Sequence, residues 1–296
     1  MKGSIRISRF IPEIFEASST EVSGLTPLTT AVNLLCLNEV QILPIVQCPE
    51  TRINPETGIK EYISFSSYAV LEAILRSDPR NYLNLVSSTK CQDVAIWIGS
   101  VRSTDSFDEL MRVLELNGFG DAIVEQEEGK RRIGIVTLND VVSLYKSDRL
   151  KSSLLVSDVS CQKISVSSST SLAEALSLML TKGIRRLFYR SENSEEDSNL
   201  RFASDRGIFS FLFAPQRLEI LKMSPESWLD AKLFDIVSGY AKTISDDATI
   251  NQASRMIGDK VDECLVCESS QEVVSRWDIV MKPWQVDSIE VAAMAT

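Results

Sequence analysis

The sequence contains no histidine in its 296 residues, and this absence excludes several kinds of chemistry. Histidine is the commonest general base and the commonest metal ligand of proteins, and Ser–His or Cys–His nucleophilic sites depend on it. Cys264 and Cys267 form a C-x-x-C pair, but they lie in the apolar run CLVC and the chain has no second such pair. We therefore expect buried thiols here and no zinc site.

Positive charge and long apolar runs are also scarce. The net charge is −10, which argues against nucleic acid as a main partner, because phosphate binding needs a concentrated positive surface. No run of about 18 or more apolar residues marks a membrane-spanning helix, and residues 1–17 lack the apolar centre of a signal peptide. Together with six scattered cysteines, these features predict a cytoplasmic protein with no membrane partner.

What the chain does contain is one pattern that recurs four times. Each copy begins with a polar residue suited to cap a helix, continues with apolar residues at the spacing i, i+3, i+4 and i+7, and ends in a short apolar strand. In the third copy this apolar face is Leu172, Ala175, Leu176 and Met179. The four copies cover residues 26–46, 103–124, 168–189 and 246–267.

A second strand and a second helix are expected after each copy, across a polar connection. The second strands are predicted at 60–67, 131–138, 205–212 and 271–278. In the third copy the helix that follows is predicted at 214–223. The unit is therefore β-α-β-β-α and roughly 60 residues long, which gives an α/β (α+β) fold class with four such units.

The spacing of the copies indicates a duplicated pair. Leu28 and Leu172 open equivalent helices at almost the same separation as Phe107 and Ile250. The boundary between the two halves is expected near 148–159. One unit of this size would leave much apolar surface uncovered, so the units are expected to pack in pairs.

A motif near the end of the unit carries a resemblance to a known family. The run 134–140, GIVTLND, ends a strand in Thr137 and places Asp140 in the first turn of the next helix. Units ending in such a G-h-h-T-x-x-D motif resemble the cystathionine β-synthase (CBS) domain, two tandem units resemble a Bateman module, and four are similar in architecture to the gamma subunit of AMP-activated protein kinase. The resemblance implies CBS units at 8–78 and 90–149 (module one) and at 152–224 and 230–284 (module two).

The resemblance also implies ligand-binding residues. In the family, the hydroxyl of the motif bonds the phosphate or ribose, and the aspartate accepts hydrogen bonds from both ribose hydroxyls. Carried over, this assigns nucleotide binding to Thr137 and Asp140 in unit two and to Ser275 and Asp278 in unit four. The alternative interpretation is a helix cap followed by an acid that complements the helix dipole, and the two roles are compatible.

Units one and three match the motif less well. Unit three keeps Gly207 and Ser210 but has Phe213 at the aspartate position, and unit one has Phe65 and Tyr68 at the two key positions. Unit four matches in part, with Glu272 where glycine is usual. A ribose clamp is therefore expected in units two and four, at most one per module, while Ser210 is retained as a candidate ligand contact.

Phosphate binding also requires cations. Unit three offers Lys182, Arg185 and Arg186 at its helix-to-strand turn, which resembles the basic cluster that neutralises phosphates in the kinase gamma subunit, and Lys260 of unit four is a weaker candidate. The alternative is a solvated turn with exposed arginines. Module one has no such cluster, so module two is expected to be the better site for a polyphosphate.

The sequence thus predicts a non-catalytic regulatory protein that binds AMP, ADP or ATP between paired units and modulates a partner protein or its own oligomer. The four units occupy almost all of 8–284, which leaves no segment for a catalytic domain. Two alternatives stay open: a structural or adaptor role with vestigial pockets, and binding of another adenosyl ligand such as S-adenosylmethionine. The adenine nucleotide is expected as a regulatory ligand, no cofactor is expected, and the chain is expected to be a monomer or homodimer.

Overall fold

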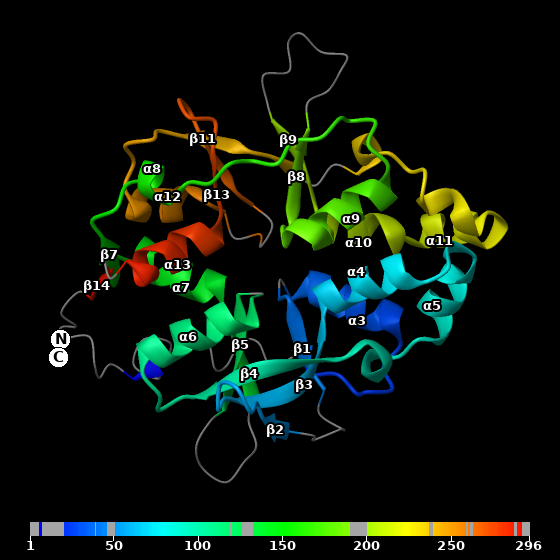
Figure 1. Cartoon of the computed structure of the whole chain (residues 1–296), viewed down its shortest axis with the longest axis horizontal. Coiled ribbons are helices and arrows are strands. Elements are labelled where there is room, and N and C mark those ends of the chain that lie inside the picture. The colour runs from blue at the N-terminus through cyan, green and yellow to red at the C-terminus, as the bar shows by residue number, and fades with distance from the viewer. Residues whose placement is uncertain are drawn as a thin grey trace.

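Helices and strands alternate along the chain and form two layered halves (Figure 1). In the view of Figure 1 the sheets lie at the upper and lower margins and most of the helices lie between them. This mixture confirms the predicted α+β class. The computed structural model describes residues 6–7, 21–38, 40–45, 51–118, 120–125, 133–189, 200–236, 239–258, 260, 263–286 and 289–291.

Unit two shows the complete repeat. Its first strand runs parallel to its second, and its second strand runs antiparallel to its third. Ser106 caps the first helix by accepting a hydrogen bond from the backbone N–H of Glu109, as the polar residue before the apolar face predicts. The elements are β4 (Ile96–Arg102), α6 (Phe107–Asn117), β5 (Asp121–Glu125), β6 (Ile133–Thr137) and α7 (Leu138–Lys146).

Unit four repeats this topology with shorter strands. The first two strands are again parallel and the last two antiparallel. Thr249 and Gln252 form a reciprocal cap at the start of the first helix. The elements are β11 (Lys242–Ile244), α12 (Ile250–Met256), β12 (Leu265–Cys267), β13 (Val273–Val274) and α13 (Arg276–Gln285).

Units one and three form a second matching pair. In both, a single parallel bridge stands where the first strand of the other units lies, Val22 with Ile45 and Ser165 with Phe188. In both, an extra helix follows the repeat, α5 (Tyr82–Ser88) and α11 (Pro215–Met223). Their other elements are α3 (Leu28–Leu37), β1 (Ile42–Pro44), β3 (Lys60–Ser66), α4 (Ser67–Arg76), α9 (Leu172–Lys182), β8 (Arg186–Tyr189), β9 (Arg201–Ser204) and α10 (Asp205–Leu212).

The predicted second strand of unit three, 205–212, is wrong. These residues form helix α10, and the strand is β9, which ends where the helix begins. Ser204 caps the helix by accepting from the N–H of Gly207, and Ile208, Phe209 and Leu212 are buried along one helical face. The run DRGIFSFL fits a helical face as well as a strand, and the cap decides for the helix. The helix predicted at 214–223 is therefore the additional helix α11.

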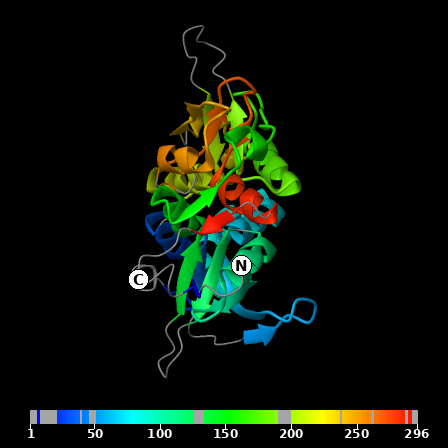
Figure 2. The same ribbon diagram turned by 90° about the vertical axis from the view of Figure 1, so that its left-hand side faces the viewer.

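Pairing between units extends the sheets. In module one, β3 pairs antiparallel with β4, which joins units one and two in a six-stranded sheet. In module two the equivalent contact is β9 with β10 (Gly239–Tyr240), immediately before β11. Strand β14 (Ile289–Val291) pairs with β7 (Leu150–Ser152). The hairpin of β2 (Thr51–Ile53) and β3 projects from the molecule (Figure 2).

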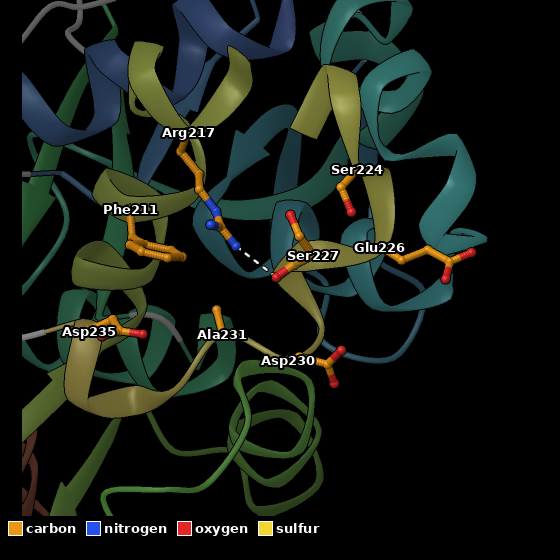
Figure 3. A pocket seen from close by; sticks show the side chains of 8 residues that line it. All are labelled: Phe211, Arg217, Ser224, Glu226, Ser227, Asp230, Ala231 and Asp235. Atoms are coloured by element: carbon orange, nitrogen blue, oxygen red, sulfur yellow. Dashed lines mark hydrogen bonds between the residues drawn. The ribbon is translucent and has the colours of Figure 1, made fainter. Parts of the chain in front are cut away.

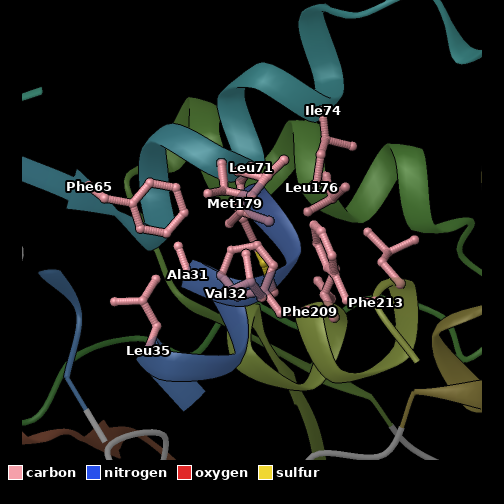
Figure 4. Close-up of a cluster of buried hydrophobic side chains, with 14 of the residues drawn as sticks. Ala31, Val32, Leu35, Phe65, Leu71, Ile74, Leu176, Met179, Phe209 and Phe213 are labelled. Carbon is pink, nitrogen blue, oxygen red and sulfur yellow. The ribbon is translucent and has the colours of Figure 1, made fainter. Parts of the chain in front are cut away.

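The buried apolar side chains form two main clusters, and each consists mainly of one unit of module one packed on one unit of module two. The first combines units one and three, with Val32, Leu71, Met179 and Phe209 among its members (Figure 4). The second combines units two and four. Fully burying a side chain of this size contributes about 1.5–3 kcal/mol, so the two modules are held together by apolar packing.

Several expectations fall partly outside the described residues. Residues 8–20 at the start of unit one and residues 131–132 of a predicted strand lie there. The four unit boundaries accordingly stay predictions. Within the described residues, no helix combines the length and the apolar character needed to span a membrane.

Candidate functional site

One cavity of about 470 Å³ is lined by residues of all four units, a size within the usual range for small-molecule pockets. Gln41 comes from unit one, Thr137 from unit two, Arg186 from unit three and Asp278 from unit four. The second helices α7, α10 and α13 begin beside it, at the turn where each follows a strand. The repeat therefore places equivalent turns around one space.

The motif of unit four lies on the cavity wall as a reciprocal helix cap. The backbone N–H and the hydroxyl of Ser275 donate to Oδ2 of Asp278 at 2.8 Å and 2.7 Å. Asp278 is only 6% exposed, and its burial raises the pKa of the carboxyl group, while the hydrogen bonds from Ser275 and the nearby charges of Lys282 and Arg186 oppose that rise. All hydrogen bonds to Asp278 from the described chain end on Oδ2, which leaves Oδ1 for a ligand.

The motif of unit two has the same internal geometry. The N–H and hydroxyl of Thr137 donate to Oδ2 of Asp140 at 2.7 Å and 2.9 Å, and burial raises the pKa of Asp140. Thr137 lines the cavity, whereas Asp140 is not among its lining residues. Both motifs are thus helix caps, as the alternative interpretation required, and the one in unit four also faces the cavity with its carboxylate.

Arg185 lines the cavity but belongs to a contact between units one and three, here called the clasp, which consists of Gln41, Ser67, Arg185 and Asp205. Nε of Arg185 donates to Oδ2 of Asp205 at 2.9 Å, and Nη2 donates to the same carboxylate, to Oε1 of Gln41 and to the hydroxyl of Ser67. The hydroxyl of Ser67 in turn donates to Oε1 of Gln41 at 2.9 Å. The charge of Arg185 is therefore compensated by Asp205.

Among the predicted cations, Arg186 is the one whose charge acts on Asp278. It lines the cavity, donates to the carbonyl oxygen of Glu263 at 3.3 Å, and lies close enough to Asp278 to lower its pKa. Lys182 and Lys260 are exposed and are not among the residues lining this cavity.

Ser210 does not occupy the position predicted for it. It lies inside α10 on an exposed face, and the residue at the strand-to-helix turn is Ser204. The equivalent residue in unit one is Ser66, which accepts from the N–H of Ala69, so the predicted alignment on Phe65 and Tyr68 is displaced by one residue. The position of the motif aspartate holds Gly207 in unit three and Ala69 in unit one, and neither side chain can accept a hydrogen bond.

Several cavity residues were not identified from the sequence. Cys161 lies 3.9 Å from Oδ2 of Asp278, and burial raises the pKa of its thiol to about 11, so it stays protonated and a poor nucleophile. Its segment has no periodic pattern that could have marked it. Asp121 could have been found, because it follows the first helix at the same distance as Arg186 does in unit three.

Asp121 begins β5 and is 2% exposed. Its Oδ2 accepts from the backbone N–H of Gln41 at 2.7 Å, a contact between units one and two. Burial raises the pKa of Asp121 to about 7, although the hydrogen bond from Gln41 and the charges of Arg185 and Arg206 oppose that rise. A carboxyl group that titrates near neutrality therefore forms part of the cavity wall.

A second hollow, of about 560 Å³, lies between α10, α11 and the segment after them (Figure 3). The guanidinium of Arg217 lies 4.8 Å from the ring centre of Phe211 and donates to the carbonyl oxygen of Ser227 at 2.8 Å. Asp230 and Asp235 border the same hollow. None of the residues predicted to bind a ligand lies here.

No protein-family model and no curated protein sequence matches the chain. Among solved structures, a Methanocaldococcus jannaschii protein described as a proposed archaeal homologue of g-AMPK covers 94% of this chain and 99% of its own, with a TM-score of 0.73 and 13% identity. A conserved protein from Pyrococcus horikoshii covers 81% of this chain and 89% of its own, with a TM-score of 0.46 and 14% identity.

A third structure is a CBS domain protein from Pyrobaculum aerophilum complexed with AMP, which covers 46% of this chain and 89% of its own at 15% identity and a TM-score of 0.33. Low identity limits these likenesses to the fold, and the Methanocaldococcus jannaschii structure alone of the three has a TM-score above 0.5. Together with the repeated topology, it shows that this chain has the fold of four tandem CBS domains, paired into two Bateman modules.

Proposed function

We propose that the protein is a non-catalytic regulatory protein that binds an adenine nucleotide in the four-unit cavity. The observation that carries this proposal is the meeting of Asp278, Ser275 and Arg186 on one wall. An ionised carboxylate with one oxygen unoccupied by the protein matches a vicinal diol, and a cation beside a helix start favours phosphate.

The cavity offers a place for each part of such a ligand. Oδ1 of Asp278 would accept from the ribose hydroxyls, and the start of α13 together with Arg186 would face the phosphate. Trp277 also lines the cavity and would supply an aromatic face for the base. No step of this binding requires a histidine or a metal ion.

Regulation would follow from the composition of the cavity wall. Thr137 belongs to module one and Asp278 to module two, so one ligand contacts both modules. A ligand that prefers one arrangement of the modules shifts the equilibrium between arrangements by its difference in affinity. The readout would be a partner protein or the assembly state, as a monomer or a homodimer.

Isothermal titration calorimetry with adenosine, AMP, ADP, ATP and S-adenosylmethionine tests the proposal. At least one adenosyl compound should bind with micromolar affinity, and Asp278→Asn should lower that affinity about 10- to 100-fold through loss of charge-assisted hydrogen bonds. Unchanged binding in Asp278→Asn would contradict the assignment of Asp278 to the ribose. The absence of heat from every compound would contradict the proposed nucleotide binding.

One observation favours a structural role for the other half of the molecule. Ala69 and Gly207 replace the motif aspartate in units one and three, and the clasp joins these units directly. A folded chain that binds no adenosyl compound but still associates with another protein would extend this adaptor role to the whole molecule.

A further inference from the structure

The charges on the cavity wall limit how much negative charge a ligand can bring. Arg185 is held by Asp205 within the clasp, and Arg276 donates to the backbone carbonyl oxygens of Gly258 and Glu263. Arg186 donates to the carbonyl oxygen of Glu263, and Lys163 donates to Oε1 of Gln271 at 3.3 Å, so each of these cations already contacts the protein. The cationic side chains that line the described cavity are Lys163, Arg185, Arg186 and Arg276.

An equal number of carboxylates lines the same wall. Asp278 faces the proposed ribose, Asp205 pairs with Arg185, and Asp121 and Glu115 have no such assigned role. With all of these groups ionised, the formal charge of the described lining is zero. A wall without excess positive charge supplies no net attraction for a polyphosphate.

Asp121 is the most deeply buried carboxylate of the described lining, with 2% of its surface exposed. The charged groups that face it are Arg185, Arg206 and Asp140. Arg185 is engaged by Asp205, and Arg206 donates to the backbone carbonyl oxygens of Val40 and Cys36 in unit one. The direct hydrogen bond to Asp121 comes from a neutral group, the backbone N–H of Gln41.

We propose that the cavity selects an adenosyl ligand with at most one phosphate, and that Asp121 is the residue that sets this limit. This inference rests on the proposed function and names the ligand class of the same site. It reverses the expectation, drawn from the arginine cluster alone, that module two favours a polyphosphate.

The size of the cavity makes the effect of one carboxylate large. A spherical space of about 470 Å³ would be roughly 10 Å across, which sets the scale of the separation between Asp121 and the phosphates of a ligand bound there. Between partly buried charges at such separations, each additional ligand charge should weaken binding by about three- to tenfold.

The test compares adenosine, AMP and ATP by calorimetry at pH 8, without magnesium, for the wild type, Asp121→Asn and the control Asp230→Asn, an exposed carboxylate on the second hollow. The wild type should bind AMP at least about tenfold more tightly than ATP. Asp121→Asn should reduce that gap about tenfold and leave adenosine within about twofold, and the control should change neither.

Two results overturn the inference while leaving the proposed function intact: ATP binding to the wild type as tightly as AMP, or Asp121→Asn changing ATP and adenosine equally. If no adenosyl compound binds to the folded wild type, the proposed function fails and this inference fails with it.

A second measurement covers the case in which Asp121→Asn does not fold. Adenosine 5′-phosphosulfate carries two charges that do not titrate between pH 6 and 8, so its affinity relative to adenosine reports on the protein. Because burial raises the pKa of Asp121 to about 7, lowering the pH from 8 to 6 should increase that ratio in the wild type. A ratio that does not change with pH contradicts the assignment to Asp121.

Discussion

The half built from units one and three and the half built from units two and four use the same fold positions differently. In the first half, two positions of each unit form the clasp. One is the residue just before strand β1 or β8, which is Gln41 or Arg185, and the other is the first residue of helix α4 or α10, which is Ser67 or Asp205. The modules are thereby joined by polar contacts that the chain itself supplies. No ligand is needed to complete them.

In the second half the equivalent positions cannot form a clasp. Unit two has Gly120 and Leu138 there, and a Cβ atom on Gly120 would lie 2.4 Å from Cδ1 of Leu138. Gly120 also has a φ of +78°, which other residues adopt only with strain. This half instead carries Asp140 and Asp278 at the positions where the first half has no carboxylate. A duplicated unit thus supplies a fixed contact in one half and a candidate ligand site in the other.

A substitution at the contact between units one and three should have the largest effect on the free energy of unfolding. Arg206 of unit three is buried and donates to carbonyl oxygens of Val40 and Cys36 in unit one, so Arg206→Ala should lower the free energy of unfolding by about 3 kcal/mol in urea titrations. Arg255→Ala is the control, because its ion pair with Asp148 is about half exposed and should be worth less than about 1 kcal/mol. Equal losses in the two variants would contradict a buried contact between units one and three.

The pH dependence of stability should show the buried carboxylate of the cavity. Burial raises the pKa of Asp121 to about 7, so its contribution to stability is fully present below the unfolded pKa of about 4 and is lost as the pH rises through 7. Asp121→Asn should therefore gain about 2 kcal/mol more over the wild type at pH 8 than at pH 5, measured by urea unfolding. A gain of the same size at both pH values would mean that Asp121 does not titrate in this range.

Substitution of the two motif aspartates should distinguish a role in ligand binding from a role in helix capping. Asp140→Asn and Asp278→Asn should each change the free energy of unfolding by no more than about 1 kcal/mol, because asparagine can still accept from the cap N–H while a buried charge is removed. Nucleotide affinity should fall about 10- to 100-fold in Asp278→Asn and less than about threefold in Asp140→Asn. Equal losses of affinity would place a ligand at both motifs.

The smallest effects are expected at the serines of unit three. Ser204→Ala removes a helix cap and should cost about 1 kcal/mol in urea unfolding. Ser210→Ala should change stability by less than about 0.5 kcal/mol and leave nucleotide binding unaltered, because Ser210 is exposed inside α10. A loss of nucleotide affinity in Ser210→Ala would instead support the sequence prediction that Ser210 contacts the ligand.

The helices of the repeat could be predicted because their signals are local. The face of Leu172, Ala175, Leu176 and Met179 is buried as the periodicity predicts, and the capping residues stand where expected. The strand predicted at 205–212 in unit three was wrong because the apolar residues there fit the period of a helix as well as that of a strand. The hydrogen bond from the N–H of Gly207 to Ser204, which caps the helix, distinguishes the two.

The shared cavity could not be predicted, because it depends on which units face each other. Asp121 meets Gln41 across 80 residues of chain, and Arg185 meets Gln41 across 144. The sequence pattern pairs unit one with unit two along the chain but does not indicate that unit one also packs on unit three. The pairing of these residues across units therefore carried no recognisable signal in the sequence.

The most direct test of the account is a crystal structure of the protein soaked in AMP. The account predicts electron density for one AMP in the four-unit cavity, with the ribose hydroxyls donating to Oδ1 of Asp278 and the phosphate near Arg186. A cavity without density for AMP, or an AMP bound elsewhere, would contradict it.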